Sequence, residues 1–139
     1  MDPVHLHFDI DGSDFTAAGE ASSEVKRVLR RLGFDGEIIR RCAICMYEGE
    51  INMVIHASGG RAEVYIDSSS IVMELVDMGP GIPDIDLAMQ EGYSTASQDI
   101  RELGFGAGMG LPNMKKYSDE MKIESEVGKG TAIYMRINA

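Results

Sequence analysis

The sequence has no apolar run of about eighteen residues, the length that a membrane-spanning helix needs. Its first residues, MDPVHLHF, contain neither the basic segment nor the apolar segment of a signal peptide. We therefore expect no membrane span and no secretion signal, and the cytoplasm is the expected location.

Basic residues are scarce, since 13 Lys and Arg stand against 23 Asp and Glu, for a formal net charge of −10. A surface of this charge repels a polyphosphate backbone, so we expect no direct binding of nucleic acid. A phosphate ligand would need backbone amides and a metal ion in place of a basic patch.

Redox and metal-binding motifs are incomplete. Cys42 and Cys45 are the two cysteines, and their C-x-x-C spacing has no second pair, no following pair of histidines and no preceding strand. We expect both to pack in the core. His5 and His7 share one face of a predicted strand at residues 4–10, but no third ligand is near, so a solvated strand face is expected.

Apolar periodicity predicts the order strand, two helices, two strands, a long connection, a helix and two strands. The long second helix begins after Asp35 as its N-cap and runs to Ser58. The strand at residues 70–77 is more apolar than its partner at 61–67, and therefore more central. The order lacks the repeated β-α-β rhythm of a doubly wound fold. It predicts one domain over residues 1–139, an α/β (α+β) two-layer sandwich with a mixed or antiparallel sheet covered on one face by helices.

The long helix carries a polar stripe. Its residues are apolar on most faces, yet Glu48, Asn52 and His56 recur at every fourth position and span only about 80° of the circumference. Burying a carboxylate and an amide costs several kcal/mol unless they meet partners. They either satisfy neighbouring backbone groups or face something polar. Gly49, directly after Glu48, interrupts the run of helix-forming residues.

The connection over residues 78–110 contains seven glycines and two prolines, a composition typical of functional lids and binding loops. Short helices are expected at about 84–91 and 98–103. Its last glycines occupy every second position before a helix predicted to begin near Leu111 and to end near Tyr117: Gly104, Gly106, Gly108 and Gly110. Glycine lets a ligand approach the main chain, and a helix N-terminus favours an anion. The spacing matches neither a dinucleotide fingerprint nor a Walker motif.

Asp77 ends an apolar strand and is followed by M-G-P-G-I. It is either a turn aspartate or a carboxylate at the rim of an apolar slot, where it would accept a hydrogen bond from an exocyclic amine. Gly79 and Gly81 would then let a flat ring lie close to the backbone. Such a slot prefers adenine to guanine, whose carbonyl would face the carboxylate.

Four motifs occur in an order that resembles the GHKL, or Bergerat-fold, ATPases, over roughly residues 35–137. They are E-x-x-x-N-x-x-x-H from Glu48, D-x-G-x-G-I from Asp77, G-x-G-x-G-x-G-L from Gly104 and G-K-G-T from Gly128. The short chain and the run GMGLPNMKKYSDEM resemble the stand-alone serine/threonine kinases that act as bacterial anti-sigma factors or stress-pathway switch kinases. The run GYSTA also resembles the ATP-binding domain of histidine kinases.

The resemblance implies ATP and Mg²⁺ as cofactors and a glycine-rich ATP lid. Asn52 would ligate the magnesium ion, Glu48 would orient or deprotonate the attacking hydroxyl, and Asp77 would hold the adenine amine with support from Thr131. The phosphates would be wrapped by the glycine motif, namely Gly104, Gly106, Gly108, Gly110 and Leu111. His56 stands where the serine-kinase subgroup often has a histidine, and a packed core histidine is the alternative.

The function implied is an anti-sigma-type protein serine/threonine kinase acting on a small, anti-anti-sigma-like regulatory protein. A sigma factor and a second copy of the chain are further candidate partners. Two alternatives remain: a nucleotide-gated binding module without transferase activity, and a detached histidine-kinase catalytic domain. No phosphoacceptor histidine region, dimerisation helix or transducer domain accompanies the motifs, so a complete histidine kinase and a gyrase-like or mismatch-repair role are not expected.

Overall fold

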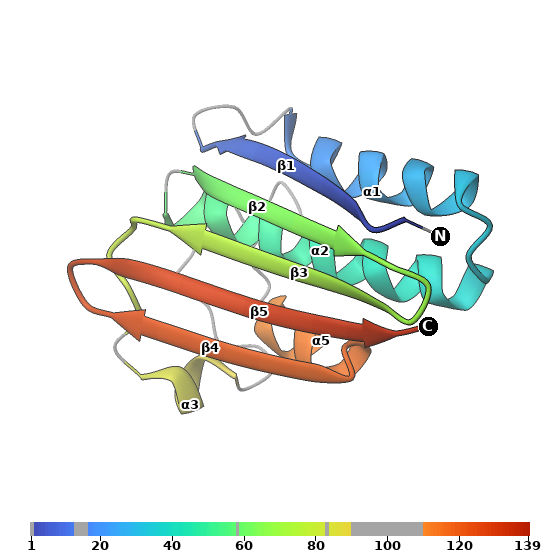
Figure 1. Ribbon diagram of the computed structural model, residues 1–139. Coiled ribbons are helices and arrows are strands. Elements are labelled where there is room, and N and C mark those ends of the chain that lie inside the picture. The colour runs from blue at the N-terminus through green and yellow to red at the C-terminus, as the bar shows by residue number, and fades with distance from the viewer. Residues whose placement is uncertain (1, 13–16, 58, 83, 90–109) are drawn as a thin grey trace.

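The computed structural model describes residues 2–12, 17–57, 59–82, 84–89 and 110–139 (Figure 1). These residues form one five-stranded sheet in the order β1-β2-β3-β5-β4, and every neighbouring pair is antiparallel. The strands are β1 (Val4–Asp11), β2 (Gly59–Ile66), β3 (Ser70–Asp77), β4 (Glu120–Glu126) and β5 (Gly130–Asn138). The helices are α1 (Glu20–Arg31), α2 (Gly36–His56), α3 (Ile85–Ala88) and α5 (Gly110–Tyr117).

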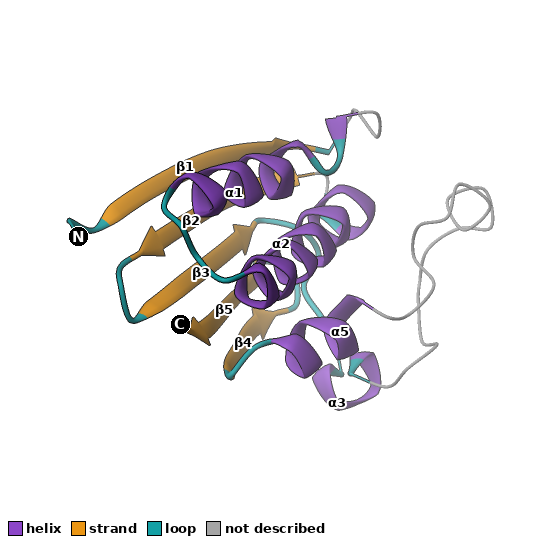
Figure 2. Cartoon of the chain, turned by 90° about the vertical axis from the view of Figure 1, so that its right-hand side faces the viewer, coloured by secondary structure: helices purple, strands orange, loops and turns teal. Residues whose placement is uncertain are grey.

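Helices cover one face of the sheet, with α2 between α1 and α5 (Figure 2). The predicted two-layer α+β sandwich is therefore confirmed, and β3 is the central strand as its apolar content indicated. The helix expected at about 84–91 is the single turn α3. The glycine-rich lid and the helix expected at 98–103 lie outside the described residues.

The core lies between the two layers and follows from the periodicity. β1 turns Val4, Leu6, Phe8 and Ile10 toward the helices and its charged or histidine side chains outward. From the helix side, fully buried Val25 and Leu29 of α1 and Met46 of α2 close the core. Cys42 and Cys45 are buried and free, and their burial raises the pKa of each thiol to about 12. Both thiols therefore stay protonated and act as core side chains, as expected.

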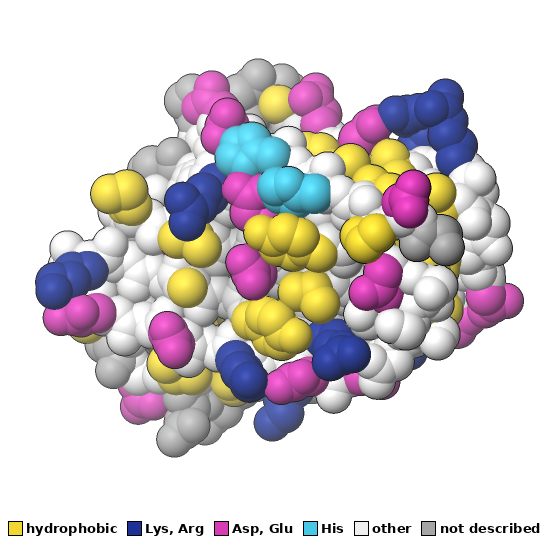
Figure 3. Space-filling model, viewed as in Figure 1, with side chains coloured by type: hydrophobic (Ala, Val, Ile, Leu, Met, Phe, Trp, Pro, Cys, Tyr) yellow, Lys and Arg dark blue, Asp and Glu magenta, His cyan; other side chains and the backbone are white. Residues whose placement is uncertain are grey.

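The other face of the sheet is not covered by helices. On it, hydrophobic side chains gather near the middle among acidic and basic ones (Figure 3). Among the described residues, no helix is both long and apolar enough to cross a membrane.

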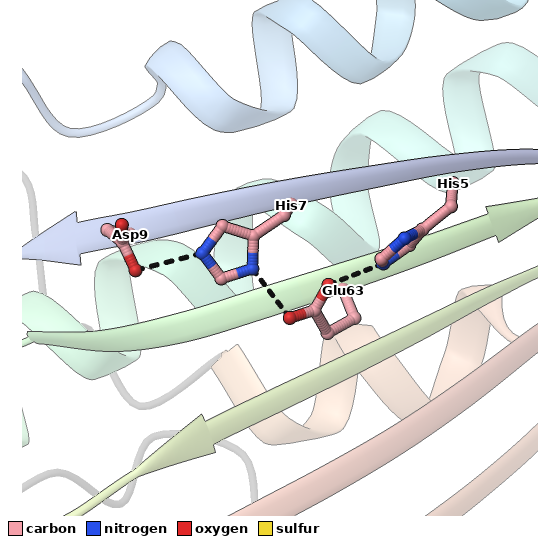
Figure 4. A network of polar contacts seen from close by, with 4 residues as sticks. All are labelled: His5, His7, Asp9 and Glu63. Carbon is pink, nitrogen blue, oxygen red and sulfur yellow. Dashed lines mark hydrogen bonds and ion pairs between the residues drawn. The ribbon is translucent and has the colours of Figure 1, made fainter.

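A polar cluster joins β1 to β2 on this uncovered face (Figure 4). The carboxylate of Glu63 lies between two imidazoles, 2.5 Å from His5 Nε2 and 2.6 Å from His7 Nδ1. His7 Nε2 is 3.0 Å from Asp9 Oδ1. Both histidines are exposed, as predicted, and the part of the chain that the structure describes contains no group of three or more acidic, cysteine or histidine side chains arranged to hold a metal.

Candidate functional site

Glu48 and Asn52 lie one turn apart on α2, which is continuous from Gly36 to His56. Its first turn is capped by Asp35, whose carboxylate accepts a hydrogen bond from the Glu37 N–H at 3.1 Å. The helix continues through Gly49, as the prediction of one long helix requires. A Cβ at this position would lie 2.4 Å from Leu75 Cδ2 of β3, so glycine is what allows the helix to lie close against the sheet.

The side chain of Glu48 on α2 lies against the beginning of α5. Its Oε1 accepts a hydrogen bond from Asn113 Nδ2 at 3.4 Å, and its Oε2 lies 3.6 Å from the place a Cβ on Gly110 would occupy. The side chain is half-buried, and this burial raises its pKa, while the bond from Asn113 acts in the opposite direction. A carboxyl group with a raised pKa at the end of the glycine motif is suited to accept a proton.

Asn52 follows Glu48 by one helical turn and is half-buried. Within the described ranges, no hydrogen bond involves its side-chain amide. His56 is the last residue of α2, and its side chain lies outside what the structure describes.

Asp77 is the centre of a second polar network at the end of β3. Its Oδ1 accepts hydrogen bonds from the N–H groups of Gly79, at 2.9 Å, and Thr131, at 3.2 Å. The register pairs Asp77 with Thr131 of β5, so the carboxylate and this buried threonine are neighbours. Thr131 Oγ1 is 2.8 Å from Ser125 Oγ, which also accepts from the Ile82 N–H at 2.7 Å. Among the described residues, both bonds to the carboxylate end on Oδ1, and Oδ2 accepts none.

Glycines allow three segments to meet around Asp77. A Cβ at Gly79 would lie 2.6 Å from Ala57 Cβ, at the end of α2. Gly81 has φ +81°, and a Cβ there would lie 2.4 Å from the Glu126 carbonyl oxygen of β4. Gly130 has φ +136°, and its Cβ would lie 2.2 Å from the Asp77 carbonyl oxygen. The sequence suggested that Gly79 and Gly81 allow a ligand ring to approach, and the structure shows that Ala57 and the Glu126 backbone already lie where their Cβ atoms would be.

The structure describes the glycine motif only from Gly110 onward. Gly104, Gly106 and Gly108 lie outside the described residues. Gly110 begins α5, and the side chain of Leu111 is buried in the core, so its backbone N–H rather than its side chain is the group that a ligand could meet.

Glu50 is a structural residue that sequence reasoning missed. It is only 2% exposed, and its carboxylate accepts from the N–H groups of Ala21, at 3.3 Å, and Ser22, at 3.2 Å. The N-cap of α1 is Gly19, which has no side chain, so Glu50 caps this helix from α2. The available signal was a carboxylate on a mostly apolar helix, where burial requires partners. Asn113 and Ser125 gave no such signal, because both are only half-buried and the bonds of Asn113 to Glu48 and of Ile82 to Ser125 join residues 65 and 43 positions apart.

The chain is similar to proteins of known family. The family model described as histidine kinase-like ATPase domain matches residues 13–137. An anti-sigma F factor of Thermoanaerobacter sp. (strain X514) is 34% identical over 99 residues, which cover 71% of this chain and 62% of that protein. The serine/threonine-protein kinase RsbT of Bacillus subtilis (strain 168) is 32% identical over 112 residues, 78% of each chain.

A solved structure shows the same fold. It contains the RsbU and RsbW domains of a Mycobacterium tuberculosis protein, and it matches with a TM-score of 0.60 and 17% identity over 99% of this chain and 32% of that one. The chain matches 62% of the length of the anti-sigma F factor, which is less than two thirds of that relative.

Proposed function

The chain belongs to the family of histidine kinase-like ATPase domains, and from this we propose that it binds ATP with Mg²⁺ and transfers the γ-phosphate to a serine or threonine of a small regulatory protein. The observation that carries the proposal is the position of Glu48. A half-buried carboxylate with a raised pKa lies against the beginning of α5, where the glycine motif ends. We also propose that residues 1–139 form one domain, which is supported by the single sheet and core of the described residues.

The relatives support a partner-switching role. One is named an anti-sigma factor and another a serine/threonine-protein kinase. We propose by analogy an anti-anti-sigma-like protein as phosphoacceptor and a sigma factor as a second partner, acting in the cytoplasm. A complex of two copies of the chain remains a prediction.

The adenine would lie at Asp77. Its Oδ2, which accepts no bond from the described residues, would accept one from the exocyclic amine. Thr131 would support this contact from β5, and Gly79 and Gly81 would form the backbone wall of the slot. The N–H groups of Gly110 and Leu111 in the first turn of α5 would face the phosphates. Gly104, Gly106 and Gly108 are assigned to the phosphates on the motif alone.

The donors present fit a magnesium ion. Mg²⁺ prefers oxygen ligands and takes few from protein, and the amide oxygen of Asn52 lies half-buried one turn from Glu48 without a partner among the described residues. When bound, the ion would neutralise charge on the phosphates. The chain itself would supply the general base: the half-buried Glu48 would accept the proton of the attacking hydroxyl.

The test is Glu48→Gln, which keeps the shape of the side chain and removes the proton acceptor. ATP affinity should stay within about twofold, while transfer to the partner should fall by about 10²- to 10⁴-fold, the usual contribution of a general base. Labelled ATP and candidate partner proteins provide the assay. Glu124→Gln, the same change at an exposed position of β4, is the control.

Three outcomes distinguish the alternatives. A Glu48→Gln variant that still phosphorylates its partner removes Glu48 from the mechanism. Acid-labile label on the partner would indicate a phosphohistidine and a detached histidine-kinase domain. Bound nucleotide recovered unhydrolysed, with no labelled protein, would indicate a nucleotide-gated binding module.

A further inference from the structure

A groove of about 560 Å³ lies between α1 and α2. Its floor contains apolar side chains of α2, namely Ile39, Ala43 and Ile44, and its rims carry three exposed cations, Lys26 and Arg30 of α1 and Arg40 of α2. The two helices lie side by side over the sheet in Figure 2. The groove therefore combines an apolar floor with positively charged edges.

Cations are concentrated around this groove. Six of the 13 basic residues of the chain fall within residues 26–41, although the net charge is −10. Arg40 is paired with Glu37 at 2.8 Å. Among the described residues, no carboxylate pairs with Lys26 or Arg30, so the α1 rim presents two uncompensated charges. An acidic partner would be attracted here and repelled by most of the remaining surface, which favours one orientation of approach.

The groove also leads to the proposed catalytic carboxylate. Tyr47 and Glu48 line it toward the C-terminal end of α2. From Ser22 to Arg30, its α1 wall extends about 12 Å, or about two helical turns, at 1.5 Å per residue. A groove with an apolar floor and charged rims is the kind of site that binds an amphipathic helix.

We propose that the α1–α2 groove binds an acidic amphipathic helix of the phosphoacceptor protein and so places that protein beside Glu48. The apolar stripe of the partner helix packs on Ile39, Ala43 and Ile44, and its acidic residues face Lys26 and Arg30. The identity of the bound protein as the acceptor rests on the proposed function, whereas the chemistry of the groove does not.

The binding test uses a stapled, fluorescein-labelled helical peptide of about 14 residues, or four turns, with a leucine stripe flanked by glutamates. Its copy with lysine in place of every glutamate is the peptide control. Arg30→Glu and Arg31→Glu form a matched pair, because both residues are exposed in the last turn of α1 and only Arg30 lines the groove.

Fluorescence anisotropy without nucleotide should show binding of the acidic peptide and none of the lysine copy. Arg30→Glu should weaken binding by about fivefold, the double variant Lys26→Glu/Arg30→Glu by about 20-fold, and Arg31→Glu by less than about twofold. Equal weakening by Arg30→Glu and Arg31→Glu, no binding of the acidic peptide, or equal binding of the lysine copy would overturn the proposal. Binding of single-stranded DNA or phosphatidylserine vesicles with the same dependence on Arg30 would replace the proposed occupant.

The outcome is separable from that of the kinase assay. Peptide binding needs no ATP, so a failure of Glu48→Gln to abolish transfer leaves the groove test unaffected. Once an acceptor is in hand, Arg30→Glu should raise its KM by about fivefold with kcat unchanged, whereas Glu48→Gln should lower kcat. A change in kcat alone for Arg30→Glu would refute a docking role.

Discussion

Substituting Asp77 by asparagine tests the proposed adenine site with little change to the fold. The native Oδ1 accepts from the N–H groups of Gly79 and Thr131, and an asparagine can keep its Oδ1 in the same place. The position of Oδ2 would then hold an NH₂ group, a donor where the adenine amine needs an acceptor. Nucleotide recognition should change far more than stability.

The expected magnitude follows from these contacts. A hydrogen bond to a charged group contributes about 1.5–3 kcal/mol, and the asparagine NH₂ would also oppose the adenine NH₂, so we expect a loss of about 2–3 kcal/mol in ATP binding. At about 1.4 kcal/mol per factor of ten, this is a 30- to 150-fold weakening. Guanine has an acceptor at the same position, so GTP should bind the variant better than it binds the parent.

Titration calorimetry with ATP and GTP, with and without magnesium, measures both effects. Asp67→Asn is the matched control, because the Oδ1 of Asp67 also accepts from backbone N–H groups, those of Ser69 at 2.8 Å and Ser70 at 2.9 Å, at the opposite end of β3. An Asp77→Asn variant that binds ATP within about threefold of the parent, with an unchanged ratio of ATP to GTP affinity, would refute the assignment of Asp77.

Three further predictions concern stability. Glu50→Ala leaves two buried N–H groups of α1 without an acceptor and should lower the free energy of unfolding in urea by about 3 kcal/mol, and a loss below about 1 kcal/mol would contradict its capping role. Gly49→Ala places a methyl group 2.4 Å from Leu75 Cδ2 and should lower the free energy of unfolding by about 1–2 kcal/mol, although alanine has the better helix propensity. A Leu75→Val background should restore part of this loss. Stabilisation by Gly49→Ala would contradict the packing argument. The bonds from His7 to Glu63 and Asp9 raise the pKa of His7 above 6.5 in the folded state. The stability that these bonds contribute is therefore complete below pH 6.5 and is lost as the pH rises through the folded-state pKa of His7. The two histidines lower the pKa of Glu63, and protonation of Glu63 at acid pH removes the stability that its bonds to them contribute. In His7→Gln, the fall in Tm above pH 6.5 should be shallower than in the parent, and an equally steep fall would exclude the cluster as its cause.

The fold was predictable where the signal is local. The alternation along β1 and the helical repeat of α1 each specify which side chains face the core, and the observed burial follows them. The central position of β3 followed from its apolar content. The pairing of β3 with β5 was not specified by either pattern, because the two strands are distant in the sequence.

The sequence shows the motifs of the candidate site, whose roles stay predictions, but it does not show the contacts that hold them in place. Glu48 and Asn52 share a stripe that the helical repeat shows directly. The partners of Glu50 lie 28 and 29 residues away along the chain, and the role of Gly49 depends on Leu75 of another strand. Such contacts join elements that are distant in the sequence, so the sequence pattern of one element does not show them.

The two glycines of the G-K-G-T turn would respond differently to a saturation mutagenesis screen. Both have left-handed backbones, with φ +82° at Gly128 and +136° at Gly130, but a Cβ on Gly128 meets nothing within 4 Å. Asparagine, which tolerates that conformation, should therefore survive at Gly128. At Gly130, the Cβ of any other residue would lie 2.2 Å from the carbonyl oxygen of Asp77, so we expect it to shift Asp77 and its carboxylate. If the proposed adenine site is correct, a replacement there that still folds should lose nucleotide selectivity, and this turn residue would then control base recognition without any contact to the base.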